Sequence, residues 1–139
     1  MITSAQRAVL ADLADILIPA GDGLPSASQA AAANHGLDDV LVALPEVEAP
    51  LIALLDGLRG ADPGVAMATL QTADPSGFDL LCTVVAGAYF LNPEVRQAIG
   101  YPGQQAVPIV PEDPPDYEQD GLLASVIGRG PIYRPTPSS

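Results

Sequence analysis

The chain has 139 residues, the size of one ordinary domain, and its 17 acidic and five basic residues give a formal charge of −12. The basic residues are five scattered arginines, so no basic stripe can attract a phosphate backbone, and we expect no nucleic-acid binding. The single cysteine excludes an internal disulfide, a CxxC redox pair and a cysteine zinc cluster. No apolar run approaches the roughly 20 residues that a bilayer span needs, so we expect no direct membrane span.

Residues 1–100 predict a body made of helices. Near the start of the chain, Ser4 can cap a helix that Pro19 and Gly21 would end. An alanine-rich segment over 26–34 ends at Gly36, and helical spacing returns over 37–44 and 47–58. The apolar residues of the first helix fall on one face: Val9, Leu10, Leu13, Ile16 and Leu17.

Three later helix starts share one chemistry, an aspartate or asparagine followed by proline. The side chain of Asp62, Asp74 or Asn92 can accept the free N–H groups of the first turn, and the proline that follows needs no acceptor. The longest of these helices is predicted over 75–91 and is apolar on most faces, which is typical of a buried central helix. No segment alternates with a period of two. The predicted fold class is therefore all-α, a compact helical domain followed by a long arm.

The arm covers 101–139, where eight prolines exclude a long helix or a central strand. We expect one short helix within it, from about Glu118 to Ile127. The arm also carries apolar residues that solvated linkers usually lack. These residues favour docking onto a partner, because a proline-rich segment loses less conformational entropy on binding than a flexible one.

The usual catalytic and cofactor motifs are missing from the sequence. Gly21-Asp22-Gly23 begins a GxGxxG pattern, but Ser26 replaces the third glycine and a helix precedes the segment, so we predict a turn there. No serine lies in a GxSxG motif, and a chain without lysine has no phosphate-binding P-loop. We therefore predict no catalytic, cofactor-binding or metal-binding residue on this chain.

His35 and the two aspartates that follow it are a candidate catalytic or metal site. His35 is the only histidine, and Asp38 and Asp39 follow at i+3 and i+4, a spacing that on a continuous helix could serve a general base or a metal. Gly36 argues against a continuous helix, but a small self-sufficient enzyme using His35 with Asp38 or Asp39 stays an alternative.

Cys82 lies in the most apolar stretch, where we expect a packed and poorly nucleophilic thiol.

The most distinctive segment covers residues 87–104 and predicts a rigid corner that aims the arm. A buried helix ends in two aromatic residues, a capped proline starts a short helix, and Gly100 closes that helix. Interface centres are enriched in arginine and tyrosine, so we predict that this corner contacts a partner. The predicted interface residues, on the corner and the arm, are Tyr89, Phe90, Arg96, Tyr101, Ile109, Val110, Ile132 and Tyr133.

The order of several short segments resembles the gluconate 2-dehydrogenase subunit 3 family, the small subunits of membrane-associated, FAD-dependent sugar and alcohol dehydrogenases. These segments are Ile16-Leu17-Ile18-Pro19-Ala20, Leu24-Pro25-Ser26-Ala27, an aromatic and Asn-Pro-x-Val segment at 90–95 (Phe-Leu-Asn-Pro-Glu-Val), Ile99-Gly100-Tyr101-Pro102-Gly103 and Gly130-Pro131-Ile132-Tyr133. Together they span most of the chain.

The resemblance implies a non-catalytic accessory subunit that binds and stabilises a large flavoprotein of the glucose-methanol-choline type. In that family, the large chain holds FAD and oxidises a CH–OH group, and a cytochrome c subunit often passes the electrons on. The family's small subunits typically bear a twin-arginine export signal, which this sequence lacks. We therefore expect a cytoplasmic location as written, or a periplasmic one if the partner carries the signal or this is a mature form. A free helical adaptor unrelated to flavins is the remaining alternative.

Overall fold

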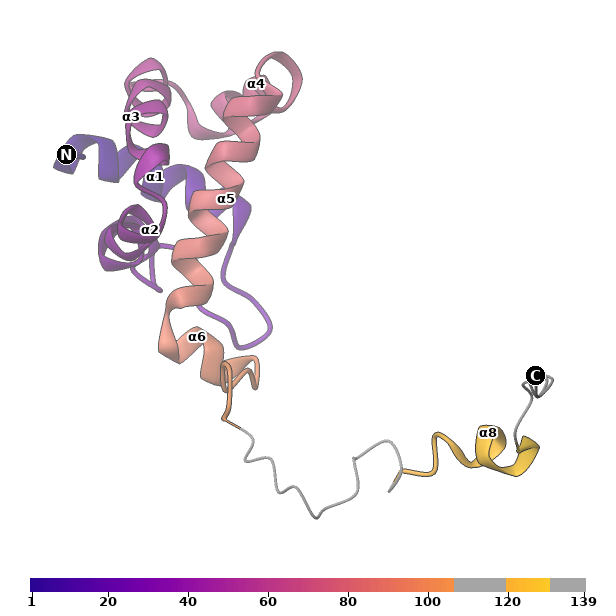
Figure 1. Ribbon diagram of the computed structural model, residues 1–139. Coiled ribbons are helices and arrows are strands. Elements are labelled where there is room, and N and C mark those ends of the chain that lie inside the picture. The colour runs from indigo at the N-terminus through magenta and orange to yellow at the C-terminus, as the bar shows by residue number, and fades with distance from the viewer. Residues whose placement is uncertain (107–119, 131–139) are drawn as a thin grey trace. The chain divides into compact units, whose positions relative to one another are not determined.

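The computed structural model describes residues 1–106 and 120–130, and the chain divides into two compact units, Met1–Gly103 and Gln104–Ser139. The first unit is a helical body, which confirms the predicted all-α fold class (Figure 1). Within the described residues no strand forms, and the only β-type pairing is a bridge between Gly21 and Leu24. The helices of the body, in chain order, are α1 (Ser4–Leu17), η1 (Ala32–Gly36), α2 (Leu37–Ala43), η2 (Pro45–Val47), α3 (Glu48–Gly57), α4 (Pro63–Ala73), α5 (Pro75–Leu91) and α6 (Pro93–Ala98).

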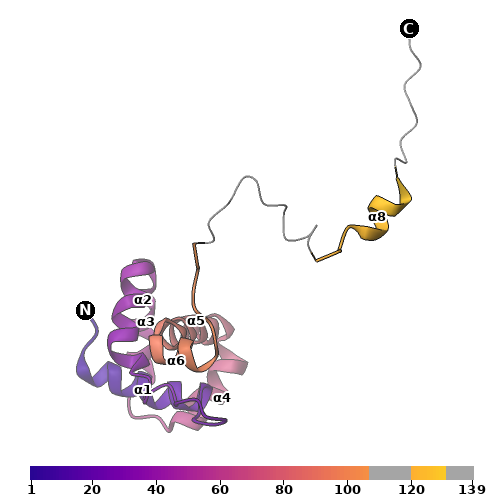
Figure 2. The ribbon, with the colours of Figure 1, turned by 90° about the horizontal axis from the view of Figure 1, so that it is seen from below.

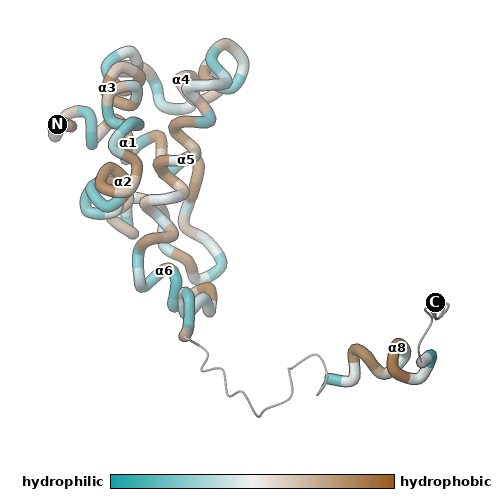
Figure 3. The backbone as a smooth tube through the Cα atoms, viewed as in Figure 1, coloured by the Kyte–Doolittle hydropathy of each residue, from teal (hydrophilic) through white to brown (hydrophobic). Residues whose placement is uncertain are grey.

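Helix α5 is the centre of the body, as its apolar sequence predicts. It contacts η1, α1, α2, α3, α4 and α6, and a view along its axis shows the other helices arranged around it (Figure 2). Leu81, Val84 and Val85 on α5 are fully or nearly fully buried, and hydrophobic residues recur along the whole helix (Figure 3). The core is therefore built on α5, with each neighbouring helix burying one apolar face against it.

The three Asx-Pro helix starts are confirmed. Asp62 accepts a hydrogen bond from the amide of Val65 at 3.0 Å, and Asp74 accepts one from the amide of Gly77 at 3.0 Å. Asn92 caps α6 through bonds from the amides of Glu94 and Val95. In each case the side-chain oxygen satisfies N–H groups that the helix itself cannot, while the proline at the first position leaves no donor unpaired.

The cap of α1 differs from the expectation. Thr3, and not Ser4, is the N-cap, because its hydroxyl accepts from the amide of Gln6 while the Gln6 side chain accepts from the amide of Thr3. The pair is a capping box, in which two free donors are satisfied reciprocally. Gln6 is buried, and its side-chain nitrogen donates to Asp56 at 3.0 Å, which ties the start of α1 to α3.

The alanine-rich segment folds as turns followed by the single π-helical turn η1, rather than as a regular helix. Ala31 has a positive φ of 54°, and Asn34 departs from helical geometry. Arg7 on α1 fastens this irregular segment, since its guanidinium donates to the carbonyl oxygens of Ala33 and Asn34 and pairs with Asp38. The ion pair is partly exposed, but the two backbone bonds satisfy carbonyls that a regular helix would have paired internally.

The second unit is described over residues 104–106 and 120–130 only. Its helix α8 (Ala124–Arg129) overlaps the expected short helix, but it begins later, after turns at 120–123, and ends two residues beyond the expected Ile127. Leu122, Val126 and Ile127 are 70%, 56% and 69% exposed, so the second unit by itself leaves these apolar side chains of the α8 region uncovered. None of the helices in the two described ranges is long and apolar enough to cross a bilayer.

Candidate functional site

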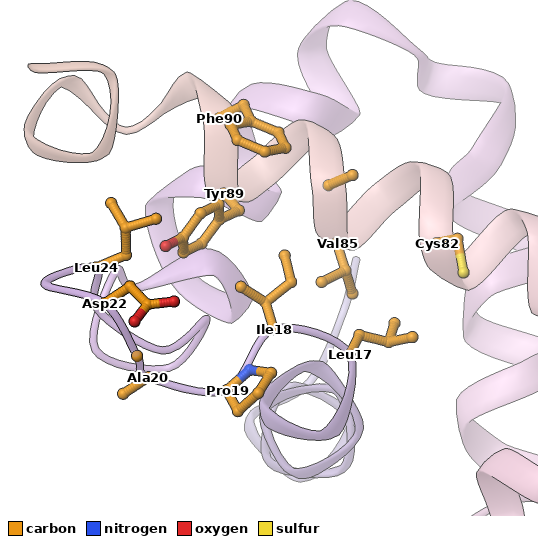
Figure 4. A pocket seen from close by; sticks show the side chains of 12 residues that line it. Leu17, Ile18, Pro19, Ala20, Asp22, Leu24, Cys82, Val85, Tyr89 and Phe90 are labelled. Carbon is orange, nitrogen blue, oxygen red and sulfur yellow. The ribbon is translucent and has the colours of Figure 1, made fainter. Parts of the chain in front are cut away.

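An apolar groove of about 590 Å³ lies between the second half of α5 and the segment that follows α1 (Figure 4). Ile18, Val85 and Tyr89 make its floor, and Phe90 stands at its edge with half of its surface exposed. The full set of lining residues is Leu17, Ile18, Pro19, Ala20, Gly21, Asp22, Leu24, Cys82, Val85, Ala86, Tyr89 and Phe90.

A tight turn shapes the loop side of the groove. Gly21 and Leu24 exchange two backbone hydrogen bonds, of 3.2 and 2.8 Å, around Asp22 and Gly23, both of which have positive φ. This is the geometry of a type I′ turn, in which an Asx-Gly pair is strongly preferred because both central residues are left-handed. The predicted turn at Gly21-Asp22-Gly23 is thereby confirmed.

Hydrogen bonds from the C-terminal end of α5 hold the loop in place. The hydroxyl of Tyr89 donates to the carbonyl oxygen of Pro25 at 2.7 Å, and the Asn92 amide donates to the carbonyl oxygen of Ala30 at 2.9 Å. Asn92 therefore caps α6 and pins the loop at once. Asp15 on α1 accepts two further hydrogen bonds, from the amide and the hydroxyl of Ser28. Burial raises the pKa of Asp15, but the hydrogen bonds from Ser28 and Ser26 outweigh burial and lower this pKa below its ordinary value. The groove is a preformed feature, fixed at several points.

Two polar groups mark opposite ends of the groove. The carboxylate of Asp22 lies beside Leu24 at one end, and the thiol of Cys82 lies at the other (Figure 4). Cys82 is half-buried rather than fully packed. Burial raises the pKa of its thiol, and the nearby negative charge of Asp79 raises it further, because both disfavour the thiolate.

We expect Cys82 to react slowly with iodoacetamide at neutral pH, because the thiolate is the reactive form and the raised pKa leaves little of it. The rate should climb with pH over a higher range than that of an unfolded cysteine. Asp79→Asn removes a repelling charge, lowers the pKa and should speed the reaction at pH 8 about twofold. The same measurement in urea provides the control, since both chains should then react alike; an equal rate for the two folded proteins would contradict the assignment.

A second hollow, of about 570 Å³, surrounds the corner after α6, and its lining includes Pro93, Arg96 and Tyr101. The amide N–H of Tyr101 donates to the carbonyl oxygen of Arg96. The amide N–H of Gly100, whose φ is +72°, donates to the carbonyl oxygen of Gln97. This pair of bonds around a left-handed glycine is a Schellman motif, which ends the helix as predicted. The guanidinium carbon of Arg96 lies 5.6 Å from the centre of the Tyr101 ring, so the cation stacks on the aromatic face.

The structure separates the predicted interface residues into three groups. Phe90 and Tyr101 are about half exposed, and Arg96 is partly exposed beside Tyr101. Tyr89 is only 2% exposed and lies beneath the groove. The rings of Tyr89 and Phe90 form a T-shaped pair, with their centroids 5.3 Å apart. The arm residues of the prediction lie outside the described residues: Ile109, Val110, Ile132 and Tyr133.

The alternative site at His35 is not assembled. His35 is exposed on the π-helical turn, and the non-helical Asn34 precedes it, so the regular i+3 and i+4 geometry is absent. Asp38 binds Arg7 instead, and no hydrogen bond joins His35 to Asp38 or Asp39 among the described residues. Within residues 1–106 and 120–130, no group of three or more His, Cys, Asp or Glu side chains is placed to hold a metal ion.

Sequence reasoning did not identify the groove, although it named Tyr89 and Phe90 on one of its sides. Ile18, Leu24 and Ala86 were not among the predicted interface residues, although Ile18 and Leu24 lie in segments that carry the family resemblance. The available signal was positional, because the proline-flanked segments at 18–20 and 24–25 stop α1 and force the chain to turn back toward α5.

Comparisons with protein-family models, with curated proteins and with solved structures found no match to this chain.

Proposed function

We propose that this chain is a non-catalytic accessory subunit that binds and stabilises a large FAD-dependent sugar or alcohol oxidoreductase. One observation carries the proposal. Four of the five segments that resemble the gluconate 2-dehydrogenase subunit 3 family contribute to the same two hollows, although they are far apart in the sequence; Pro131 to Tyr133 of the fifth lie outside the described residues. Leu17 to Ala20, Leu24 and Phe90 line the groove, and Pro93 and Gly100 to Pro102 line the corner.

The physical character of these surfaces supports docking rather than chemistry. The groove is apolar, preformed and edged by an exposed phenylalanine, while the corner offers an arginine stacked on a tyrosine. Apolar side chains, tyrosine and arginine are the groups that carry most binding energy at protein interfaces. Exposed apolar side chains on α8 add a further candidate contact.

In this proposal the reaction belongs to the partner. The large chain would hold FAD, which would accept the hydride when a CH–OH group of a sugar or alcohol loses a hydride and a proton to become a carbonyl, while this chain maintains the partner's fold. A cytochrome c subunit that accepts the electrons and the compartment of the complex are parts of the same proposal, drawn from the resemblance.

A tagged copy of the full chain tests the proposal. We expect it to co-purify with a larger protein that shows flavin absorbance, and that protein should oxidise an alcohol or sugar with an artificial electron acceptor. The chain purified alone should show neither flavin absorbance nor activity. Turnover by the isolated chain would contradict the proposal, and so would a co-purified partner without flavin, which is the result expected of a free adaptor.

Arg96→Ala should weaken the complex by about 2 kcal/mol, the scale of an interface hot spot and about 30-fold in Kd. The stability of the free chain should fall by no more than about 1 kcal/mol, because an exposed cation–π contact contributes about that much. Titration of the flavoprotein with each purified chain, together with thermal unfolding of the free chain, measures both quantities.

Arg59→Ala is the matched control for that change. Arg59 is also a surface arginine, but it follows the end of α3, where its guanidinium forms an exposed i,i+3 pair with Asp56, and it lines neither hollow. Its loss should leave affinity unchanged. Equal weakening by the two substitutions would show that net charge, and not the corner, matters.

A further inference from the structure

We propose that the groove beside α5 binds an apolar segment of the partner protein that carries a lysine or arginine, with the cation paired to Asp22. The identity of the partner as a flavoprotein rests on the proposed function. The chemistry of the bound segment rests on the groove itself.

The dimensions of the groove fit a short stretch of polypeptide. Along α5, its lining residues run from Cys82 to Phe90, eight residues apart, which corresponds to about 12 Å of helix. An extended segment of about four residues, or about two turns of helix, covers that length. Leu17, Ile18 and Ala86 are only half-buried, so a partner side chain can reach the floor without unfolding the loop.

The negative charge of the body favours a partner segment that carries a cation. Residues 1–103 contain 12 acidic residues and three arginines, and all three arginines have contacts within the body. Arg7 binds Asp38, Arg59 binds Asp56, and Arg96 stacks on Tyr101. The cation for Asp22 must therefore come from another part of the chain or from another molecule, and the excess of acid on this chain favours a basic partner.

The position of Asp22 is fixed. It occupies the first left-handed position of the type I′ turn, between the paired residues Gly21 and Leu24. Several other acidic residues of the body have partners within it, since Asp62 and Asp74 cap helices and Asp15 binds Ser28, and Asp22 is the acidic residue that lines the groove. Among the described residues, no side chain donates a hydrogen bond or an ion pair to Asp22, so its carboxylate is available at the end of the apolar floor.

The first experiment compares two charge-removing variants in the complex with the flavoprotein. Asp22→Asn should raise Kd about tenfold at low salt, which is about 1.4 kcal/mol, and should reduce the salt dependence of binding. Asp39→Asn is the matched control, because Asp39 is an exposed aspartate on α2 that lines neither hollow. It removes the same charge and should leave Kd within about twofold.

The second experiment uses the only cysteine as a probe of the groove. Formation of the complex should slow alkylation of Cys82 by iodoacetamide at least tenfold, because the bound segment covers the thiol. Ala86→Trp fills the groove and should abolish binding. Thr83→Trp places the same side chain on an exposed position of α5 outside the groove and should bind normally. Circular dichroism of each free variant shows that the fold is kept.

The outcomes separate this inference from the proposed function. A flavoprotein complex in which Cys82 reacts at its free rate, or in which Asp22→Asn binds like the wild type, overturns the inference and leaves the proposed function standing. A partner without flavin that protects Cys82 and requires Asp22 supports the inference and contradicts the function. If no protein binds the chain, both are wrong.

Discussion

Gly36→Ala should destabilise the free chain by about 2 kcal/mol, although alanine is the better helix former. Gly36 lies where η1 meets α2, and a Cβ at this position would stand 2.6 Å from the backbone carbonyl oxygen of Ala88 on α5. A backbone atom cannot rotate aside as a side chain can, so the two elements must separate. Gly87 shows the same close packing from the other side, because its Cβ would meet Val40 at 3.1 Å.

Gly57→Ala is the control that isolates this steric effect. Gly57 ends α3, and a Cβ there would meet nothing within 4 Å. This substitution should be neutral or stabilising by up to about 1 kcal/mol. For a body of this size, a loss of about 2 kcal/mol lowers the thermal midpoint by roughly 10 °C, which circular dichroism resolves easily. Equal midpoints for the two variants would contradict the close packing of η1 on α5.

A chain that ends at Gly103 should keep its helical circular dichroism and its thermal midpoint but lose co-elution with the flavoprotein. Every buried core residue of the described ranges lies within residues 2–95, so the body retains its core. The truncation removes the exposed Leu122, Val126 and Ile127 together with the rest of the arm. Apolar burial stabilises by about 25 cal/mol per Å², so losing several hundred Å² of contact amounts to several kcal/mol before binding costs.

A full-length variant with Leu122, Val126 and Ile127 all replaced by serine separates apolar contact from chain length. It should weaken the complex in the same direction as the truncation, while the fold of the body stays unchanged because these side chains are exposed. If the truncated chain still co-elutes, the body alone secures the partner and the arm has no part in binding.

Much of the fold is predictable because its signals are local. An aspartate or asparagine before proline specifies both the cap and the first turn, and Asp62, Asp74 and Asn92 each do so in the structure. The apolar character of α5 likewise indicates its central position. The cap of α1 lies one residue before the predicted Ser4, because Thr3 and Ser4 have the same capping chemistry and only the reciprocal bonds between Thr3 and Gln6 distinguish them.

The groove was not predictable, because it depends on contacts between residues distant in the sequence. The hydroxyl of Tyr89 donates to the carbonyl oxygen of Pro25, 64 positions away, and the side-chain amide of Asn92 donates to that of Ala30, 62 positions away. These bonds, together with those from Ser28 to Asp15, fix the loop that carries Asp22 and Leu24. The irregular turn η1 was likewise not predictable from local sequence, because the carbonyl groups that it leaves unpaired are satisfied by Arg7 on α1.

The most direct test of the accessory-subunit proposal is the thermal unfolding of the flavoprotein, prepared without this chain and then mixed with it. A partner that binds only the folded flavoprotein stabilises it by about 2.7 kcal/mol at a free concentration of 100 times Kd. We therefore predict that adding the chain raises the temperature at which flavin is released, and that the Arg96→Ala chain requires a higher concentration for the same rise. An unchanged release temperature at saturating chain would contradict the proposal that this protein stabilises a flavin-dependent partner.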